Sequence, residues 1–303
     1  MTGNMNTRSR NMPFRFFTRD LRPLLRPAVS LAAAGLAGLG FLQIRPAGLD
    51  LCLSVGAVFL LACGASACNQ VQEKDRDALM RRTENRPLPA GRLRPAMALG
   101  IALGCVAAGC ILLYMVGGTR AAVAGCVPLA LYNGLYTPLK HRSALSLPVG
   151  ALAGAAPIPL GAVAAGGGLE NPIVPLLFGI AVIWQIPHFW LRAMRHREDY
   201  LRAGFVVPFL RLPADLGPRA ALLWLPALGA SLLLPHLFFR PSNVFASLAL
   251  GLIAVSLSVI PLRVLHRRLD PTRALRAADI AVCLGFLLLS ADGGIHLLLQ
   301  ELP

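Results

Sequence analysis

The sequence predicts an all-α, polytopic membrane protein with about nine transmembrane helices around a central cavity. Apolar residues make up 56% of the 303 residues, charged residues make up 14%, and the mean hydropathy is +0.63. These values do not fit a soluble domain of this length. The apolar residues also gather in windows of about 20, which is the length that one helix needs to cross the hydrocarbon core. The composition therefore excludes a soluble protein.

Nine apolar windows follow one another along the chain, and their boundaries are approximate because glycines and prolines interrupt many of them. We expect helices over 27–44, 49–68, 96–117, 121–138, 146–167, 171–190, 220–239, 244–262 and 278–298. Residues 1–26 are polar and basic, so we expect a cytoplasmic and partly disordered segment there. Residues 27–303 then form a single transmembrane domain.

The cations lie almost entirely in alternate connections between the windows. Of the 29 Lys and Arg residues, only Arg45, Arg120 and Arg240 lie in the other set of connections. By the positive-inside rule, the cation-rich connections and the amino terminus are cytoplasmic, in the plasma (inner) membrane. Nine crossings then place the carboxyl terminus outside. The net charge of +15 is thus explained by membrane topology, and we expect no nucleic-acid partner.

Two of the cytoplasmic connections carry acids as well as arginines. Six of the 14 acids follow the second and sixth windows closely: Glu73, Asp75, Asp77, Glu84, Glu198 and Asp199. If the second helix continues past the membrane, Asn69, Glu73 and Asp77 share one face because they recur every four residues, and Asp75 points elsewhere. Two carboxylates and an amide oxygen on one stripe are ligands that Mg²⁺ accepts.

Cations near these acids favour a phosphate-binding site. Mg²⁺ that is held by few protein oxygens completes its shell with water and a substrate phosphate. The side chains that can grip such a phosphate are Arg82, Arg86, Lys140 and Arg142. Together, the metal and the cations would stabilise a diphosphate as a leaving group. A loop of mutually neutralising salt bridges explains the same pattern without a ligand.

Three stretches of the chain resemble one enzyme family. NQVQEKDRDALMRRTENRPLPAGR, from Asn69 to Arg92, resembles the first aspartate-rich motif of the UbiA superfamily of intramembrane prenyltransferases, and more narrowly that of the protohaem IX farnesyltransferases. Tyr136, Thr137, Lys140 and Arg142 resemble the loop between the fourth and fifth helices of that family. The third stretch, WQIPHFWLRAMRHREDYLRAGFVVP, starts at Trp184 and resembles its Trp-Gln-x-Pro-His-Phe-Trp helix and the Asp-Tyr motif that follows.

The resemblance implies a UbiA-type fold and the Mg²⁺-dependent transfer of a farnesyl group from farnesyl diphosphate to haem B, with water, giving haem O and diphosphate. It implies that the metal ligands are Asn69, Glu73, Asp77 and Asp199, and that Arg82 and Lys140 also take part in catalysis. The residues implied to contact substrate are Arg86, Arg142, Tyr136, His188, Tyr200 and Asp75. The implied partners are haem B, farnesyl diphosphate, membrane lipids, and a haem A synthase or oxidase assembly factors. Glu73 departs from the family pattern, which has Asp there.

Alternatives remain open for one residue and for the reaction. His188 is suited to be an axial ligand of haem. It is equally suited to a structural role at the membrane interface. The acceptor could instead be an aromatic quinone precursor. A secondary transporter is the alternative from another class, and it predicts ionisable residues buried along the helices. The apolar windows are almost free of charge, which favours the prenyltransferase.

Overall fold

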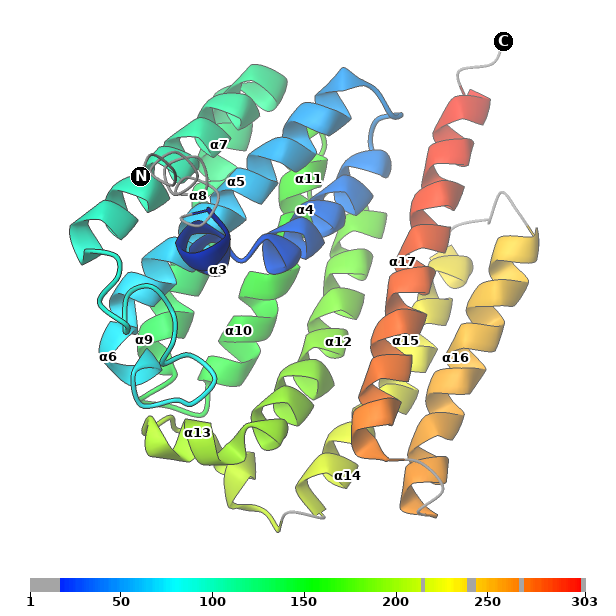
Figure 1. Cartoon of the computed structure of the whole chain (residues 1–303). Coiled ribbons are helices and arrows are strands. Elements are labelled where there is room, and N and C mark those ends of the chain that lie inside the picture. Colours follow the sequence, from blue (N-terminus) through cyan, green and yellow to red (C-terminus); the bar gives the residue numbers. More distant parts are fainter. Residues whose placement is uncertain (1–16, 214–215, 239–243, 267–269, 301–303) are drawn as a thin grey trace, which may run out of the picture.

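The computed structural model describes residues 17–213, 216–238, 244–266 and 270–300, and its regular elements in these ranges are all helices (Figure 1). The first half of the chain forms η1 (Phe17–Leu21), α3 (Arg22–Leu25), α4 (Pro27–Leu42), α5 (Leu49–Gln72), α6 (Lys74–Asp77), α7 (Pro95–Ala124), α8 (Cys126–Leu129), η2 (Ala130–Tyr136), α9 (Thr137–Leu139), α10 (Ser146–Ala155) and α11 (Pro157–Ala164). Here α5 packs between α4 and α7, and α11 packs against α4 and α7. The all-α prediction is confirmed.

The second half of the chain closes the bundle. It forms α12 (Ile173–Arg195), α13 (Arg197–Arg202), η3 (Pro208–Arg211), α14 (Leu216–Leu222), α15 (Trp224–Phe238), α16 (Val244–Leu265) and α17 (Pro271–Gln300). The helix α12 packs against α10 on one side and α15 on the other, and α17 contacts α16, α12 and α4. Figure 1 shows α12 between the first half of the chain and the group of α15, α16 and α17.

Seven helices of the described residues are long and apolar enough to cross a membrane, so the predicted count of nine is approximate. The third and fourth windows merge into one helical stretch, 95–139, with a kink at Gly117 and Gly118. Gly118 has a φ of 64°, a left-handed conformation that glycine adopts without steric cost. The ninth window lies within α17.

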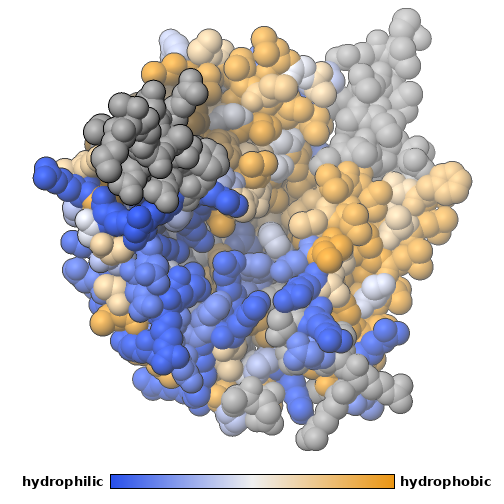
Figure 2. Space-filling view, in the orientation of Figure 1, coloured by the Kyte–Doolittle hydropathy of each residue, from blue (hydrophilic) through white to orange (hydrophobic). Residues whose placement is uncertain are grey.

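Apolar side chains cover the outside of much of the bundle. Ile111 and Met115 on α7 and Leu248 and Leu252 on α16 are each more than 60% exposed. In Figure 2 hydrophobic residues spread over α16 and the upper part of the view, and hydrophilic residues gather at the lower left around α6 and α13. A surface of this kind needs lipid as its solvent. The chain is an integral membrane protein.

Glycines let α4 and α11 cross with their backbones in contact. A Cβ atom on Gly161 would overlap the carbonyl oxygen of Ala37, and one on Gly40 would overlap that of Ile158. Close approach through small residues is a common way for membrane helices to gain packing energy. Residues of both helices line an apolar cavity.

We expect Gly161→Val to lower the thermal unfolding midpoint of the purified protein in detergent. Forcing extra carbons into a packed crossing costs about 1–3 kcal/mol. Gly35→Val is the matched control, because a Cβ on this exposed residue of α4 meets no atom within 4 Å. Equal midpoints for the two variants would contradict the backbone contact.

Candidate functional site

Asn69, Glu73 and Asp77 lie on one buried stripe, as the four-residue spacing predicts. Their exposed fractions are 3%, 5% and 4%. The expected continuous helix is broken, because α5 ends at Gln72 and Glu73 has φ −106° and ψ 12°. The Glu73 N–H still donates to the Asn69 carbonyl at 2.9 Å, and the Asp77 N–H donates to the Glu73 carbonyl at 2.8 Å. These bonds keep the stripe facing inward.

Glu73 joins the second membrane helix to the segment after α9. The Lys140 Nζ atom lies 2.9 Å from one Glu73 carboxylate oxygen and 3.0 Å from the other. The Asn69 side-chain amide donates to the same carboxylate at 2.9 Å and to the Thr137 hydroxyl at 3.0 Å. The Thr137 hydroxyl in turn donates to the carbonyl of Tyr132 at 2.8 Å. The carboxylate is therefore held by a cation and an amide at once.

Lys140 is a buried cation between aromatic rings. Its Nζ atom lies 4.5 Å from the centroid of the Tyr136 ring and 5.9 Å from that of Phe205, which is cation–π geometry. Burial lowers the pKa of Lys140, but Tyr136 and Glu73 outweigh burial and hold this pKa above its usual value. The ammonium group stays charged throughout the physiological range.

Asp77 forms the second ion pair of the stripe. An Arg86 Nη atom donates to its carboxylate at 2.7 Å, and the two side chains are 16% and 6% exposed. Burial lowers the pKa of Arg86, and the charge of Asp77 and its hydrogen bond offset part of that effect. The Thr83 hydroxyl donates to the Asp77 carbonyl at 2.8 Å, which fixes the loop beside the pair.

Asp199 on α13 ties the two acidic loops together. Its carboxylate accepts the backbone N–H groups of Arg81 at 3.1 Å and Arg82 at 3.3 Å, and Arg202 lies 3.9 Å away. Burial raises the pKa of Asp199, but these N–H groups and cations outweigh it and hold the pKa below its usual value. Arg76, which the sequence did not single out, adds a second tie by donating to the Ala203 carbonyl at 2.7 Å.

The side chains of three candidate charged residues lie on the surface, outside this network. The side chains of Asp75, Arg82 and Arg142 are exposed. Arg82 contributes through its backbone N–H to Asp199, and its guanidinium group has no ion-pair partner among the described residues. The sequence does not distinguish the exposed Arg82 and Arg142 from the buried Lys140 and Arg86, because packing with distant segments decides which side chains are buried.

The carboxylates lie along the site instead of forming a compact cage. Among the described residues, no three His, Cys, Asp or Glu side chains lie close enough together to hold a metal ion. Mg²⁺ usually binds through one or two carboxylates and fills its octahedral shell with water and phosphate. The buried oxygens of Asn69, Glu73, Asp77 and Asp199 fit that kind of site, and they do not fit an all-protein metal cage.

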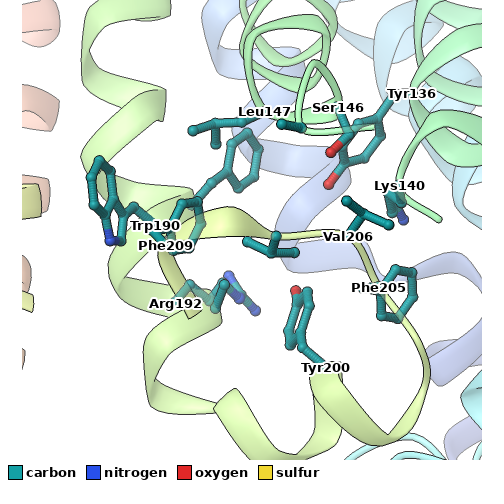
Figure 3. A pocket seen from close by; sticks show the side chains of 14 residues that line it. Tyr136, Lys140, Ser146, Leu147, Trp190, Arg192, Tyr200, Phe205, Val206 and Phe209 are labelled. Carbon is teal, nitrogen blue, oxygen red and sulfur yellow. The ribbon is translucent and has the colours of Figure 1, made fainter. Parts of the chain in front are cut away.

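An aromatic pocket of about 290 Å³ opens beside Lys140 (Figure 3). Trp190 and Phe209 form one wall, with ring centroids 4.6 Å apart and nearly parallel planes. Figure 3 shows Tyr136, Arg192 and Tyr200 with their polar ends toward this pocket. The pocket thus combines flat apolar walls with two cations, Lys140 and Arg192.

A second cavity of about 130 Å³ lies between α4, α5, α8, α10 and α11. Its lining is apolar apart from Ser66 and Tyr132, and it includes Val58, Leu61 and Leu160. The Tyr132 ring lies 5.5 Å from the ring of Tyr136, which lines the aromatic pocket. Of the residues in the buried ion pairs, Lys140 lines the aromatic pocket, and the two tyrosines connect that pocket to the second cavity.

His188 lies on α12 and pairs with a residue that the sequence reasoning missed. The Asp279 carboxylate on α17 lies 2.9 Å from His188 Nδ1, and the same oxygen accepts the Trp184 indole N–H at 3.0 Å. Asp279 falls inside an apolar window, where an acid is itself a signal of function. Asp279 is also an exception to the expectation that the apolar windows are almost free of charge.

Residues 22–291 match the UbiA prenyltransferase family. The chain belongs to that family. This UbiA prenyltransferase is 38% identical to a "protoheme IX farnesyltransferase" of Oleidesulfovibrio alaskensis over 89% of this chain and 97% of that protein. It is 43% identical to the protein of the same name from Geobacter sulfurreducens over 72% of this chain and 80% of the relative. Its membership in an enzyme family decides against the transporter alternative.

Solved structures of the family share the fold. A UbiA homologue from Aeropyrum pernix K1 superposes with a TM-score of 0.68 at 20% identity, over 91% of this chain and 99% of that one. A homologue from Archaeoglobus fulgidus, solved with GPP and Mg²⁺ bound, gives 0.67 at 15% identity, over 89% and 99%. The UbiA-type fold implied by the sequence motifs is confirmed.

We expect Asp199→Asn to release the 78–94 loop from α13 and to increase its cleavage by trypsin. The folded-state pKa of Asp199 is depressed, so its contribution is present above the ordinary carboxyl value and is lost as pH falls through the folded pKa. In the wild type, protection of the loop from cleavage should therefore stay constant around neutral pH and fall only below about pH 4. A short exposure to acid before digestion measures this loss of protection. The exposed neighbour Glu198→Gln is the control, and equal cleavage of both variants would contradict the tie.

Proposed function

We propose that this UbiA prenyltransferase is a protohaem IX farnesyltransferase, which converts haem B, farnesyl diphosphate and water to haem O and diphosphate. The observation that carries the proposal is the two buried ion pairs, Glu73–Lys140 and Asp77–Arg86, of which Lys140 also lines the aromatic pocket. The identity with relatives of that name over most of the chain supports haem B as the acceptor.

The buried cations are placed to receive the diphosphate. Lys140 and Arg86 are each held by one carboxylate inside the protein, so an incoming phosphate can take over as their partner. Both remain charged, and a preorganised cation in a site shielded from water stabilises a departing anion strongly. When bound, Mg²⁺ would neutralise further charge on the diphosphate, held by oxygens of Asn69, Glu73, Asp77 and Asp199.

In the reaction the allylic carbon–oxygen bond, the π bond of the haem vinyl group and one O–H bond of water break, and a carbon–carbon and a carbon–oxygen bond form. The allylic carbon–oxygen bond of farnesyl diphosphate breaks, and its electron pair leaves with the diphosphate that Lys140 and Arg86 stabilise. The vinyl group of haem B then bonds to the allylic carbon, and water captures the resulting cation and loses a proton. Burial of the ion pairs keeps other water away from the allylic cation.

The apolar cavity and the aromatic pocket suit farnesyl diphosphate and haem B, respectively. The apolar cavity between α4, α5 and α10 offers a lining for an isoprenoid chain. The aromatic pocket offers flat walls for a macrocycle, and Arg192, which is not one of the cations assigned to the diphosphate, can pair with a carboxylate at the edge of the macrocycle. An aromatic quinone precursor is the alternative acceptor, and it is not a macrocycle.

The orientation in the membrane also belongs to this proposal. The distribution of cations supports a cytoplasmic amino terminus, an outer carboxyl terminus and acidic loops on the cytoplasmic face of the inner membrane. Contact with a haem A synthase or with oxidase assembly factors stays a prediction from the family resemblance.

We expect membranes that contain this protein, and no other haem-modifying prenyltransferase, to form haem O from haem B, farnesyl diphosphate and Mg²⁺. Mass spectrometry of extracted haems measures the product. Asp77→Asn should lower turnover by roughly 10²- to 10³-fold, because it removes the charge that holds Arg86 in the site. Asp50→Asn is the control, since this acid pairs with Arg45 at the exposed end of α5. Unchanged haem from folded wild-type protein would contradict the proposal.

We expect Glu73→Asp to retain turnover within about tenfold of the wild type, whereas Glu73→Gln should lose at least about a hundredfold. The shorter acid keeps a negative charge for Lys140, and the amide removes that charge while keeping the length. The same mass-spectrometric assay measures both. Equal activity of the glutamine variant and the wild type would show that the carboxylate charge plays no part.

A further inference from the structure

Asp279, His188 and Trp184 form a partly buried polar cluster between α12 and α17. His188 lies seven residues before the end of α12, about 10 Å along the helix, and Asp279 lies at a similar depth in α17. One Asp279 oxygen accepts the Trp184 N–H at 3.0 Å and lies 2.9 Å from His188 Nδ1. His188 and Asp279 lie at the ends of the apolar windows 171–190 and 278–298, where a paired ionisable group is a candidate site of function.

The cluster sets which nitrogen of His188 is free. An ionised carboxylate only accepts hydrogen bonds, so Nδ1 carries the proton that faces Asp279. The neutral imidazole then presents a lone pair at Nε2, which has no hydrogen-bond partner among the described residues. A carboxylate behind a histidine is the usual way in which proteins orient an imidazole and raise its basicity toward a metal ion.

His188 is partly exposed and contacts a ring that lines the aromatic pocket. The His188 side chain is 24% exposed, and Ala181 and Leu177, which share its helix face, are both 0% exposed. The edge of its ring meets Phe189 at 5.9 Å between centroids, and Phe189 stacks on Tyr136 at 6.4 Å. Phe189 and Tyr136 line the aromatic pocket beside Lys140, so His188 adjoins the region where the acceptor would react.

We propose that His188 binds the iron of the metalloporphyrin acceptor through Nε2, and that Asp279, with Trp184, is the positioning residue that holds His188 for this role. The inference rests on the proposed function, because it takes the acceptor to be a haem. Iron ligation would fix the centre of the macrocycle next to the aromatic pocket, whose lining includes Lys140. A vinyl group at the edge of the macrocycle would then lie toward the diphosphate.

The test is a titration of the purified full-length protein in lipid nanodiscs with ferric haem b, followed by its Soret absorption. Wild-type protein should give the band of an imidazole-ligated haem. His188→Ala should shift the band and weaken binding at least about tenfold, and added imidazole should restore the band in this variant. Asp279→Asn should weaken haem binding and haem O formation roughly 10- to 100-fold. His266→Ala is the matched control, because this histidine is exposed on the surface at the end of α16.

Metal-free protoporphyrin IX separates iron ligation from a role in packing. Its binding, measured by fluorescence, should be equal for the wild type and His188→Ala, and an equal loss of both porphyrins would overturn the proposal. A wild-type Soret band in His188→Ala would also overturn it, even if the protein makes haem O. Wild-type protein that shows the imidazole band but forms no haem O would overturn the proposed reaction and leave the ligation supported.

Discussion

The ion pair between Glu73 and Lys140 is the contact on which the site depends. Each of these charges costs several kcal/mol to remove from water, and only close geometry and further hydrogen bonds offset that cost. Here the ammonium group reaches both carboxylate oxygens, Asn69 donates to the same group, and the Tyr136 ring lies under the cation. The pair also joins segments 67 residues apart. The two charges can therefore be buried as a pair only when these segments pack together.

The charged loop can be interpreted as a salt-bridge network or as a phosphate-binding site. Both interpretations involve the same side chains, without and with a ligand. Without a ligand, the carboxylates of Glu73 and Asp77 neutralise Lys140 and Arg86, which is the salt-bridge network that charge patterning suggests. A diphosphate carries the negative charge that these cations need, so it can replace the carboxylates and free them for a metal ion. A buried network that is satisfied before the substrate arrives keeps the protein folded without closing the site.

The rest of the bundle provides an apolar frame for this polar site. Glycine at the crossing of α4 and α11 brings the backbones together beside the apolar cavity. On the other side of the bundle, Asp279 connects α17 to α12 through Trp184 and His188. The frame thus contains an apolar cavity, an aromatic pocket and, in the lining of that pocket, the buried charge of Lys140.

The sequence by itself determined the membrane class, the approximate helices, the family and the acids of the stripe, because hydropathy and motifs are properties of neighbouring residues. It could not show the break at Glu73, the exposure of Arg82 and Arg142, or the partner of each carboxylate. Asp199 meets the backbone of Arg81 across 118 residues, and Asp279 meets Trp184 across 95. Contacts of that span depend on how the helices pack, so only the tertiary structure decided which charges are buried in pairs and which remain on the surface.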